Sequence, residues 1–479
     1  MIGRGVQTAR LATAALVLLI LLAAYLGLGA QIPGTATTQA VRAGLLIALA
    51  VALPRLVDVT GARTIPALPW ITGALGLIAW FAPWFLRVIG RDGLGYATYE
   101  AFRVPATAVP GFADITDNLM VPICARQGFD VYTPPFTCTG SIYGPGLVWL
   151  QVLPVSTAWI IPVGLAMGAA STVSLWWLSR RSSLPGQIVL LVASIGVAWL
   201  LLVERANLDA AIIWVAILLV FMTERWSGLW PWAVGALLIF ILGTWKYYPF
   251  LMGLALLPVL RIRRGWMLLV AWIVAVIAFA AANLHLLTWS ASANNSIAKL
   301  YPDGVLGRKA LASLLQGSAD MVTAVGVWDA VTLLLCLVAA AWGALSLRAF
   351  QGAGAYATSP RIGNPMLAIA GSTAFLMAAT ISGFGYVYKA ALLLLCVPLL
   401  AQVSTSSSRR IRADGQTLLI LLVLAVTIAT EPLVLTLTTC VVGSYAFGLS
   451  AALLVRTVIT DRPTRQMNPL HAGSSGNSP

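Results

Sequence analysis

The chain has 479 residues and a formal net charge of +14, and hydrophobic residues make up 60% of it against 9% charged. This composition, with a mean hydropathy of +0.91, excludes a soluble globular protein and indicates an integral membrane protein. The basic residues are scattered over many short loops, which argues against a nucleic-acid-binding patch.

The apolar residues fall into long continuous runs, many of them near the ~20 residues that a helix needs to cross a bilayer. Lipid leaves no water for bare backbone groups, and the runs do not alternate in polarity, so helices are predicted rather than a barrel. We therefore expect an all-α, polytopic transmembrane bundle of about 12–14 spans. The predicted spans are 9–30, 41–57, 68–90, 146–179, 185–203, 207–223, 229–245, 248–260, 265–288, 322–347, 364–381, 387–402, 416–432 and 434–455.

Some predicted spans are not simple crossings. The pair 229–245 and 248–260 is short and is typical of a hairpin that does not fully cross, and segment 146–179 is too long for one span, so an interfacial turn is expected at its start. Segment 9–30 follows basic residues as a signal peptide would, but no clear cleavage site follows, and we interpret it as a retained anchor. We expect an N-terminal hairpin in residues 1–67 and a transmembrane core in residues 68–402. A C-terminal hairpin in residues 403–462 and a disordered cytoplasmic tail in residues 463–479 are expected to follow.

The charges are distributed unequally between the two sides of the membrane. With the N-terminus inside, the inner loops hold 18 of the 29 basic residues, whereas 11 of the 15 acidic residues lie outside or near outer span ends. All four lysines, Lys246, Lys299, Lys309 and Lys389, fall on the outer side. Because cytoplasmic loops carry an excess of basic residues, the acid-rich and lysine-rich loops are predicted to be extracytoplasmic.

The first large outer loop, residues 91–141, contains two neighbouring acids, Asp114 and Asp117. Apolar residues four apart predict a short surface helix that begins with Asp114 as its N-cap and ends at Gly128, although Pro122 opposes it. The two carboxylates would then lie at the start of this helix. The loop leaves two interpretations of Asp114 open, a functional carboxylate and a simple helix cap.

The five cysteines do not form a metal-ligand framework. Cys336, Cys396 and Cys440 lie in apolar runs and are expected to act as small hydrophobic residues. Cys124 and Cys138 share the first outer loop and would form a disulfide in an oxidising compartment. The sequence leaves their pairing open.

A second polar segment, residues 204–209, connects two predicted spans at their outer ends. It contains Arg205, Asn207 and Asp209, and polar side chains at this depth are costly unless they serve a site. The alternative is structural, since Arg205 and Asp209 are four residues apart and would pair with each other on one helix.

A third segment places Lys246 beside Tyr247 and Tyr248 at the tip of the short hairpin. A cation among aromatic rings suits a phosphate with an apolar chain, but a lysine that snorkels within an aromatic belt is the alternative. Lys389 follows two tyrosines in the same manner and is either part of this site or of a solvated rim. Carboxylates, cations and rings on one face together match a lipid-linked phosphosugar, in which one carboxylate accepts the proton of an acceptor hydroxyl.

On these motifs the chain resembles GT-C-type membrane glycosyltransferases, and within them the polyprenol-phosphate-mannose-dependent mannosyltransferases of glycosyltransferase family 87. The resemblance covers about residues 68–402. It rests on the Asp114 loop with its Gly128-Phe-Asp-Val-Tyr turn, on residues 204–209, and on Trp245-Lys246-Tyr-Tyr-Pro. Asp114 matches the spacing of the family's catalytic aspartate better than Asp117.

The resemblance implies inverting, metal-independent and cofactor-free transfer of mannose or another hexose or pentose. The donor would be a polyprenyl-phosphate sugar and the acceptor a lipid or a glycan, on the extracytoplasmic face of a bacterial cell membrane. It also implies that Arg205, Asn207, Asp209, the Lys246–Tyr248 segment and Lys389 bind the donor.

The chain departs from the family in its extra N-terminal hairpin and in Arg-Ala-Asn, where many relatives have Arg-Gly-Asn. It also has Gly385-Tyr-Val-Tyr-Lys389 in place of a more acidic motif. These differences leave the sugar and the acceptor open. The competing hypotheses are a transporter or lipid-linked-sugar flippase, since broken helices and intramembrane charges occur there as well, and a non-catalytic scaffold. Against transport, the short hairpin has no inverted counterpart in the other half of the chain.

Overall fold

The computed structural model describes residues 64–95, 112–132, 138–139, 144–288, 305–306, 321–351, 364–381, 385–406, 408–427 and 432–460. The predicted spans 9–30 and 41–57, the tail 463–479, and Lys299 and Lys309 lie outside these residues. Within the described residues the fold is a helical bundle with one two-residue antiparallel pair, β1 (Val305–Leu306) with β2 (Gly385–Tyr386).

The described part of residues 64–288 forms a first group of helices. They are α3 (Leu68–Val88), α5 (Ala113–Arg126), α6 (Gly146–Trp149), η1 (Leu150–Val152), η2 (Thr157–Trp159), α7 (Ile160–Arg181), α8 (Leu184–Ala193), α9 (Val197–Glu204), α10 (Asp209–Arg225), α11 (Trp230–Lys246), η3 (Tyr248–Arg261) and α12 (Gly265–Ala282). Of these, α5, α9, α10 and α11 begin or end at the polar segments. The short α6, η1 and η2 precede α7, so the expected turn at the start of segment 146–179 is confirmed.

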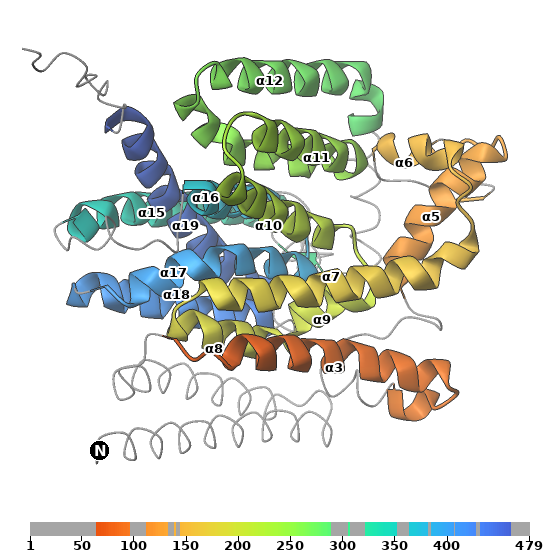
Figure 1. Ribbon diagram of the computed structural model, residues 1–479, viewed down its shortest axis with the longest axis horizontal. Coiled ribbons are helices and arrows are strands. Elements are labelled where there is room, and N and C mark those ends of the chain that lie inside the picture. The colour runs from red at the N-terminus through yellow and green to blue at the C-terminus, as the bar shows by residue number, and fades with distance from the viewer. Residues whose placement is uncertain are drawn as a thin grey trace, which may run out of the picture.

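The described part of residues 321–460 forms a second group of helices. They are α15 (Met321–Gln351), α16 (Asn364–Ile381), η5 (Val387–Cys396), α17 (Val397–Ser404), α18 (Arg409–Thr427) and α19 (Pro432–Thr460). Of these, η5 and α17 are almost wholly buried over their described residues. In Figure 1 most helices lie roughly side by side, α19 crosses them steeply, and α5 and α6 lie together at one end.

Five described helices are long and apolar enough to cross a membrane, and a sixth span is obtained if the bent pair α8 and α9 is counted as one. These spans are Leu68–Val88, Thr157–Arg181, Gly265–Ala282, Val327–Ser346 and Thr436–Val455. The helical fold is therefore confirmed for the described residues, and the length and composition of these helices support a membrane protein. The roughly 12–14 spans expected from the full sequence remain a prediction.

The predicted span 185–203 is not one straight helix. It breaks into α8 and α9, which are bent by 54°. The break contains Gly196, where a Cβ would lie 2.9 Å from the Val426 carbonyl oxygen, so the backbones approach closely at this point. The bend leads α9 to its end at Glu204, directly before the second polar segment.

The short hairpin predicted over 229–260 is present as α11 and η3. The chain reverses at Tyr247, whose φ of 59° and ψ of −57° are unusual for a residue with a side chain. Pro249 follows in the first turn of η3, where its missing N–H is tolerated. This reversal places Lys246 at the tip of the hairpin.

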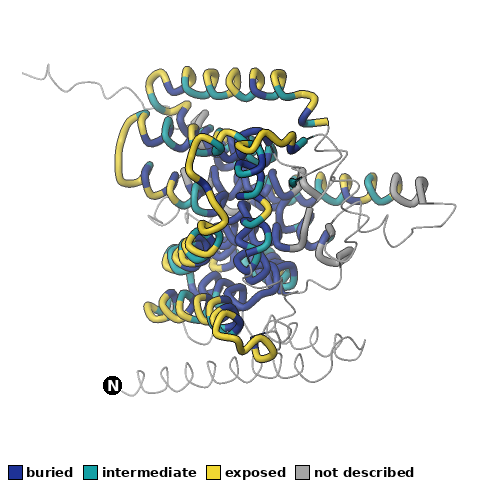
Figure 2. The backbone as a smooth tube through the Cα atoms, turned by 90° about the vertical axis from the view of Figure 1, so that its right-hand side faces the viewer, coloured by how far each residue is buried: buried dark blue, intermediate teal, exposed yellow. Residues whose placement is uncertain are grey.

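The buried residues form one continuous apolar core, drawn dark blue in Figure 2. Residues 390–401 of η5 and α17 are all buried in it. Helix α12, at the top of both views, is mostly exposed along its length (Figures 1 and 2), with Trp266, Val270, Val274 and Ile277 at the surface. An exposed face this apolar suits contact with lipid.

Candidate functional site

Helix α5 carries the two acids of the first outer loop. Its N-cap is Phe112, in a left-handed conformation with φ of 60°, and no side chain caps the helix. The expectation that Asp114 is the N-cap is therefore wrong, because the helix begins at Ala113 and Asp114 lies in its first turn. The helix also continues through Pro122, although a proline was expected to oppose it.

The predicted end of α5 at Gly128 is confirmed. The Gly128 N–H bonds the Ala125 carbonyl at 3.0 Å, and the Phe129 N–H bonds the Cys124 carbonyl at 3.1 Å. This is the Schellman arrangement, in which the residue after the C-cap adopts positive φ, here 86° at Gly128.

Cys124, near this end of α5, forms a disulfide with Cys138, with 5.9 Å between their Cα atoms. The pairing that the sequence left open is thus made.

Backbone hydrogen bonds attach the start of α5 to the end of α9. The Phe112 N–H donates to the Glu204 carbonyl at 3.1 Å, and the Asp114 N–H donates to the Arg205 carbonyl at 3.0 Å. The first N–H groups of a helix need partners outside it, and the last carbonyls of α9 supply them. This contact brings the first and second polar segments together.

Asp114 is 6% exposed, and both of its carboxylate oxygens are bound. Arg205 donates to Oδ1 from Nε at 2.8 Å and from Nη2 at 2.6 Å, and Asn207 donates to Oδ2 from Nδ2. Asp114 is therefore held by two side chains of another segment, and the interpretation as a simple helix cap does not fit. The alternative of an Arg205–Asp209 pair is also wrong, because Arg205 pairs with Asp114.

Asp209 pairs instead with Lys246 across the hairpin tip. The Lys246 ammonium lies 2.7 Å from Asp209 Oδ1 and 2.7 Å from Asn207 Oδ1, and the Tyr248 hydroxyl donates to Asp209 Oδ1. Asp209 is fully buried and Lys246 is 7% exposed. The interpretation of Lys246 as a snorkelling surface lysine does not fit this burial.

Lys389 joins the same group from η5. Its ammonium lies 4.2 Å from the centroid of the Tyr248 ring, a cation–π contact. Lys389 is 6% exposed, so the alternative that places it in a solvated rim is wrong. Residues 390–401, which follow it, are all buried, and this packing takes Lys389 into the protein.

We call the group formed by Asp114, Arg205, Asn207, Asp209, Lys246, Tyr248 and Lys389 the polar cluster. Its members come from four segments of the chain, namely α5, residues 205–209, the hairpin tip and η5. Three of its side chains are cationic and two are anionic, which leaves an excess of one positive charge. A buried cluster with this excess attracts an anion such as a phosphate.

Asp117 and Tyr247 were predicted to belong to the site and lie beside this cluster. Asp117 is exposed on α5. Partial desolvation and then repulsion by the Asp114 carboxylate raise the pKa of Asp117, and the Arg205 charge opposes this rise. Tyr247 packs its ring 6.4 Å from that of Phe279, and its buried hydroxyl has no hydrogen-bond partner among the described residues.

Two supporting features were missed in the sequence. Arg87, at the end of α3, forms a buried ion pair with Glu204, with 3.9 Å between Nη1 and Oε1. A charged residue near the end of an apolar span was the available signal for this pair. The second feature is the close contact of Gly144 with the hairpin, where the Gly144 N–H donates to the Trp245 carbonyl at 2.7 Å.

Gly144→Ala is expected to displace the hairpin tip. A Cβ at this position would lie 2.0 Å from the Thr244 carbonyl oxygen, so the backbones must separate. Overpacking of this kind costs about 1–3 kcal/mol, and a lower melting temperature in detergent would measure it. Gly93→Ala is the matched control, because nothing lies within 4 Å of a Cβ there. Equal melting temperatures for the two variants would contradict the close contact.

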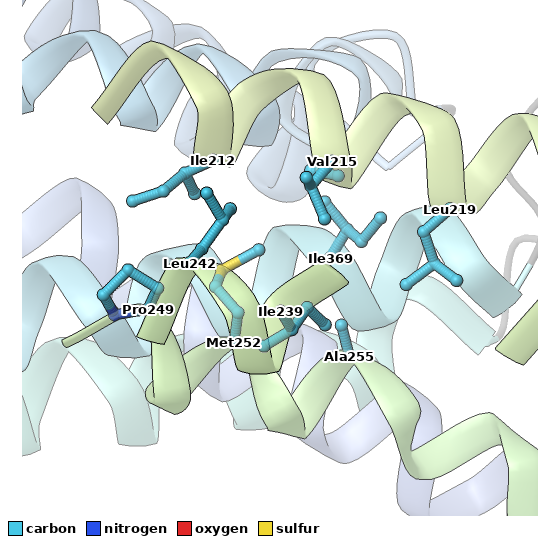
Figure 3. A pocket seen from close by; sticks show the side chains of 10 residues that line it. Ile212, Val215, Leu219, Ile239, Leu242, Pro249, Met252, Ala255 and Ile369 are labelled. Atoms are coloured by element: carbon cyan, nitrogen blue, oxygen red, sulfur yellow. The ribbon is translucent and has the colours of Figure 1, made fainter. Parts of the chain in front are cut away.

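Apolar side chains of the described residues line a small pocket (Figure 3). Pro249, next to Tyr248, and Ile212, three residues after Asp209, both line it. The remaining lining is also apolar and comprises Val215, Ala216, Leu219, Ile239, Leu242, Met252, Ala255 and Ile369. The pocket therefore adds an apolar surface next to the charged groups and no further charge.

Comparison of the chain with protein-family models, with curated proteins and with solved structures finds no match to any of them. What the chain does is therefore inferred from its polar cluster and its motifs.

Proposed function

We propose that the chain is a GT-C-like glycosyltransferase that moves a sugar from a polyprenyl phosphate to a hydroxyl group of a lipid or glycan. The observation that carries this proposal is the buried polar cluster, which joins three cations and two carboxylates at one end of a membrane bundle. A lipid-linked donor brings an anionic phosphate and an apolar chain to the same place. The cluster supplies positive charge for the phosphate, and the apolar helices supply contact for the prenyl chain.

The phosphate is bound by the cations of the cluster. Lys246 is held in place by Asn207 and Asp209, at 2.7 Å from each, so its charge is oriented before a donor arrives. Lys389 and Arg205 add two further charges. In the transfer step the bond from the sugar to the phosphate oxygen breaks, and the electron pair leaves with the prenyl phosphate. The cations stabilise the charge that develops there.

Asp114 is the general base. The acceptor oxygen attacks the anomeric carbon from the face opposite the phosphate, which inverts the configuration, and the hydroxyl proton passes to Asp114. Arg205 and Asn207 hold the carboxylate in one orientation. Each carboxylate oxygen has two acceptor positions, so a position remains for the acceptor hydroxyl.

Transfer by the purified chain in nanodiscs tests the function. We expect a radiolabelled sugar to move from polyprenyl phosphate to membrane lipids or cell-wall glycans, and not to move from a nucleotide sugar. The Asp114→Asn variant serves as the inactive control. Equal use of a nucleotide sugar, or no transfer from any polyprenyl-phosphate hexose or pentose, would refute the proposal.

We propose that the cluster faces away from the cytoplasm, since the basic residues favour the other side and the Cys124–Cys138 disulfide suits an oxidising compartment. Gly93→Cys lies after α3 and Ser227→Cys lies after α10, and both positions are exposed. We expect an impermeant thiol reagent to label Gly93→Cys in intact cells and Ser227→Cys only after lysis, with the parent chain as background. The reverse pattern would invert the topology.

Flipping of a lipid-linked sugar is the second candidate, and the broken pair α8 and α9 favours it, because broken helices line transport sites in membrane carriers. Proteoliposomes distinguish the two functions. A flippase exposes a lipid-linked sugar to an external periodate reagent without forming a new glycosidic product. A transferase forms that product and consumes the donor.

A further inference from the structure

A buried amide on α5 has no hydrogen-bond partner among the described residues. Asn118 is 1% exposed, and neither Nδ2 nor Oδ1 of its side chain is bonded to a described residue. No other described residue has two buried side-chain polar atoms left in this state. A side-chain amide offers two donor hydrogens and two acceptor positions, and leaving them buried and unmet is costly.

The backbone carbonyl of the same residue lacks its regular helical hydrogen bond. In a regular helix the carbonyl of Asn118 accepts from the N–H of the residue four positions later, which here is Pro122. Proline has no N–H, so this bond is absent. Buried polar groups in native proteins are nearly always satisfied, and an exception indicates a ligand, a catalytic role or an ordered water.

Asn118 lies on the same face of α5 as Asp114. The two residues are four apart, so their side chains are neighbours, and they are separated by roughly 6 Å along the helix axis. This separation is comparable to the width of a hexose ring. Asp114 is in turn connected through Asn207 to Lys246, so Asn118 lies one helical turn from a member of the polar cluster.

The hydrogen-bonding chemistry of Asn118 differs from that of the two lysines. Lys246 and Lys389 can only donate to a ligand, and they suit a phosphate. A neutral amide both donates and accepts, and so does a sugar hydroxyl, whereas the phosphodiester anion of the donor only accepts. We propose, on the basis of the proposed function, that Asn118 is a positioning residue that binds ring hydroxyls of the donor sugar while the lysines bind its phosphate.

Binding to the full chain in nanodiscs tests this assignment without knowledge of the acceptor. The probes are a short-chain prenyl methyl phosphate, a sugar-free diester with the single charge of the donor, and the same prenyl phosphate carrying mannose, glucose, galactose or arabinose. Binding is followed by tryptophan fluorescence. The sugar that strengthens wild-type binding over the sugar-free lipid is then used for the variants. Asn118→Leu keeps the number and branching of the side-chain heavy atoms and removes the amide. Gln127→Leu is the control, because Gln127 is an exposed amide at the end of the same helix.

We expect Asn118→Leu to bind the sugar-bearing lipid roughly 5- to 150-fold more weakly, the loss of two neutral hydrogen bonds. Its affinity for the sugar-free lipid should equal that of wild type, as should both affinities of Gln127→Leu. The melting temperature should be unchanged or raised, since an unmet polar group is replaced by an apolar one. Single-deoxy donor analogues should identify the hydroxyl, because the variant no longer discriminates against the analogue that lacks it.

Three results would overturn the assignment. Equal affinity of Asn118→Leu and wild type for the sugar-bearing lipid would mean that the amide contacts water or nothing. Weaker binding of both lipids would mean a structural role, as would a lower melting temperature. If no sugar strengthens wild-type binding, there is no sugar subsite. Failure of the proposed function gives a different result, in which wild type binds neither lipid.

Discussion

Asp114→Asn is expected to lower transfer by roughly 10²- to 10⁴-fold, the usual effect of losing a general base. The amide is nearly isosteric, so the Arg205 contact persists in neutral form and the chain should still fold. Donor binding should change little, because the phosphate is held at the lysines. The measurement is single-turnover transfer at saturating donor, with the binding assay run in parallel.

Asp117→Asn is the matched control for this prediction. Asp117 lies on the same helix and is exposed. Among the described residues no side chain bonds it in the way that Arg205 and Asn207 bond Asp114. Its variant should retain most of the activity. If instead Asp117→Asn is inactive and Asp114→Asn is active, then the base is Asp117, and the raised pKa of Asp117 would be part of its function.

Lys246→Met is expected to weaken binding of the polyprenyl-phosphate donor by roughly 10- to 150-fold. The loss corresponds to one charge-assisted hydrogen bond, worth about 1.5–3 kcal/mol. Lys246→Arg should retain part of the affinity, since the charge persists but the compact ammonium is lost. Titration of the donor in nanodiscs measures both, and the sugar-free lipid should show the same loss.

The same substitution also leaves Asp209 buried without its cation. Breaking a buried ion pair in this way destabilises a protein by about 3–5 kcal/mol, so weaker binding alone does not separate a lost phosphate contact from lost folding. The double variant Lys246→Met with Asp209→Asn removes both charges and should recover most of the melting temperature. If it also recovers donor binding, then Lys246 serves the fold and does not bind phosphate.

The composition and the apolar runs were sufficient by themselves to determine the class of the protein. Continuous apolar runs require helices in lipid, and the described spans confirm this. Local signals also placed a helix end at Gly128 and a chain reversal at the Lys246–Pro249 tip, since a glycine ends a helix and a proline cannot continue one. The candidate residues were found because polar groups are rare in such runs.

Which of these residues contact one another was decided only by the tertiary structure. Arg205 and Asp209 are four apart, as in a helical pair, but α9 ends at Glu204, Ala206 has a φ of 48°, and α10 begins at Asp209. The pairing rule for a continuous helix therefore does not hold. The side chains turn to Asp114 and Lys246, which are distant in sequence and carry no local signal of the contact.

The burial of the charged side chains also could not be predicted from the sequence. A lysine beside tyrosines occurs both in a solvated rim and in a site, and the two differ only in what packs around them. Lys389 is buried because η5 runs through the core, and Asp114 is buried because the end of α9 supplies partners for the first N–H groups of α5. Sequence spacing places charges along one chain, whereas the free energy of a buried charge depends on partners from other segments.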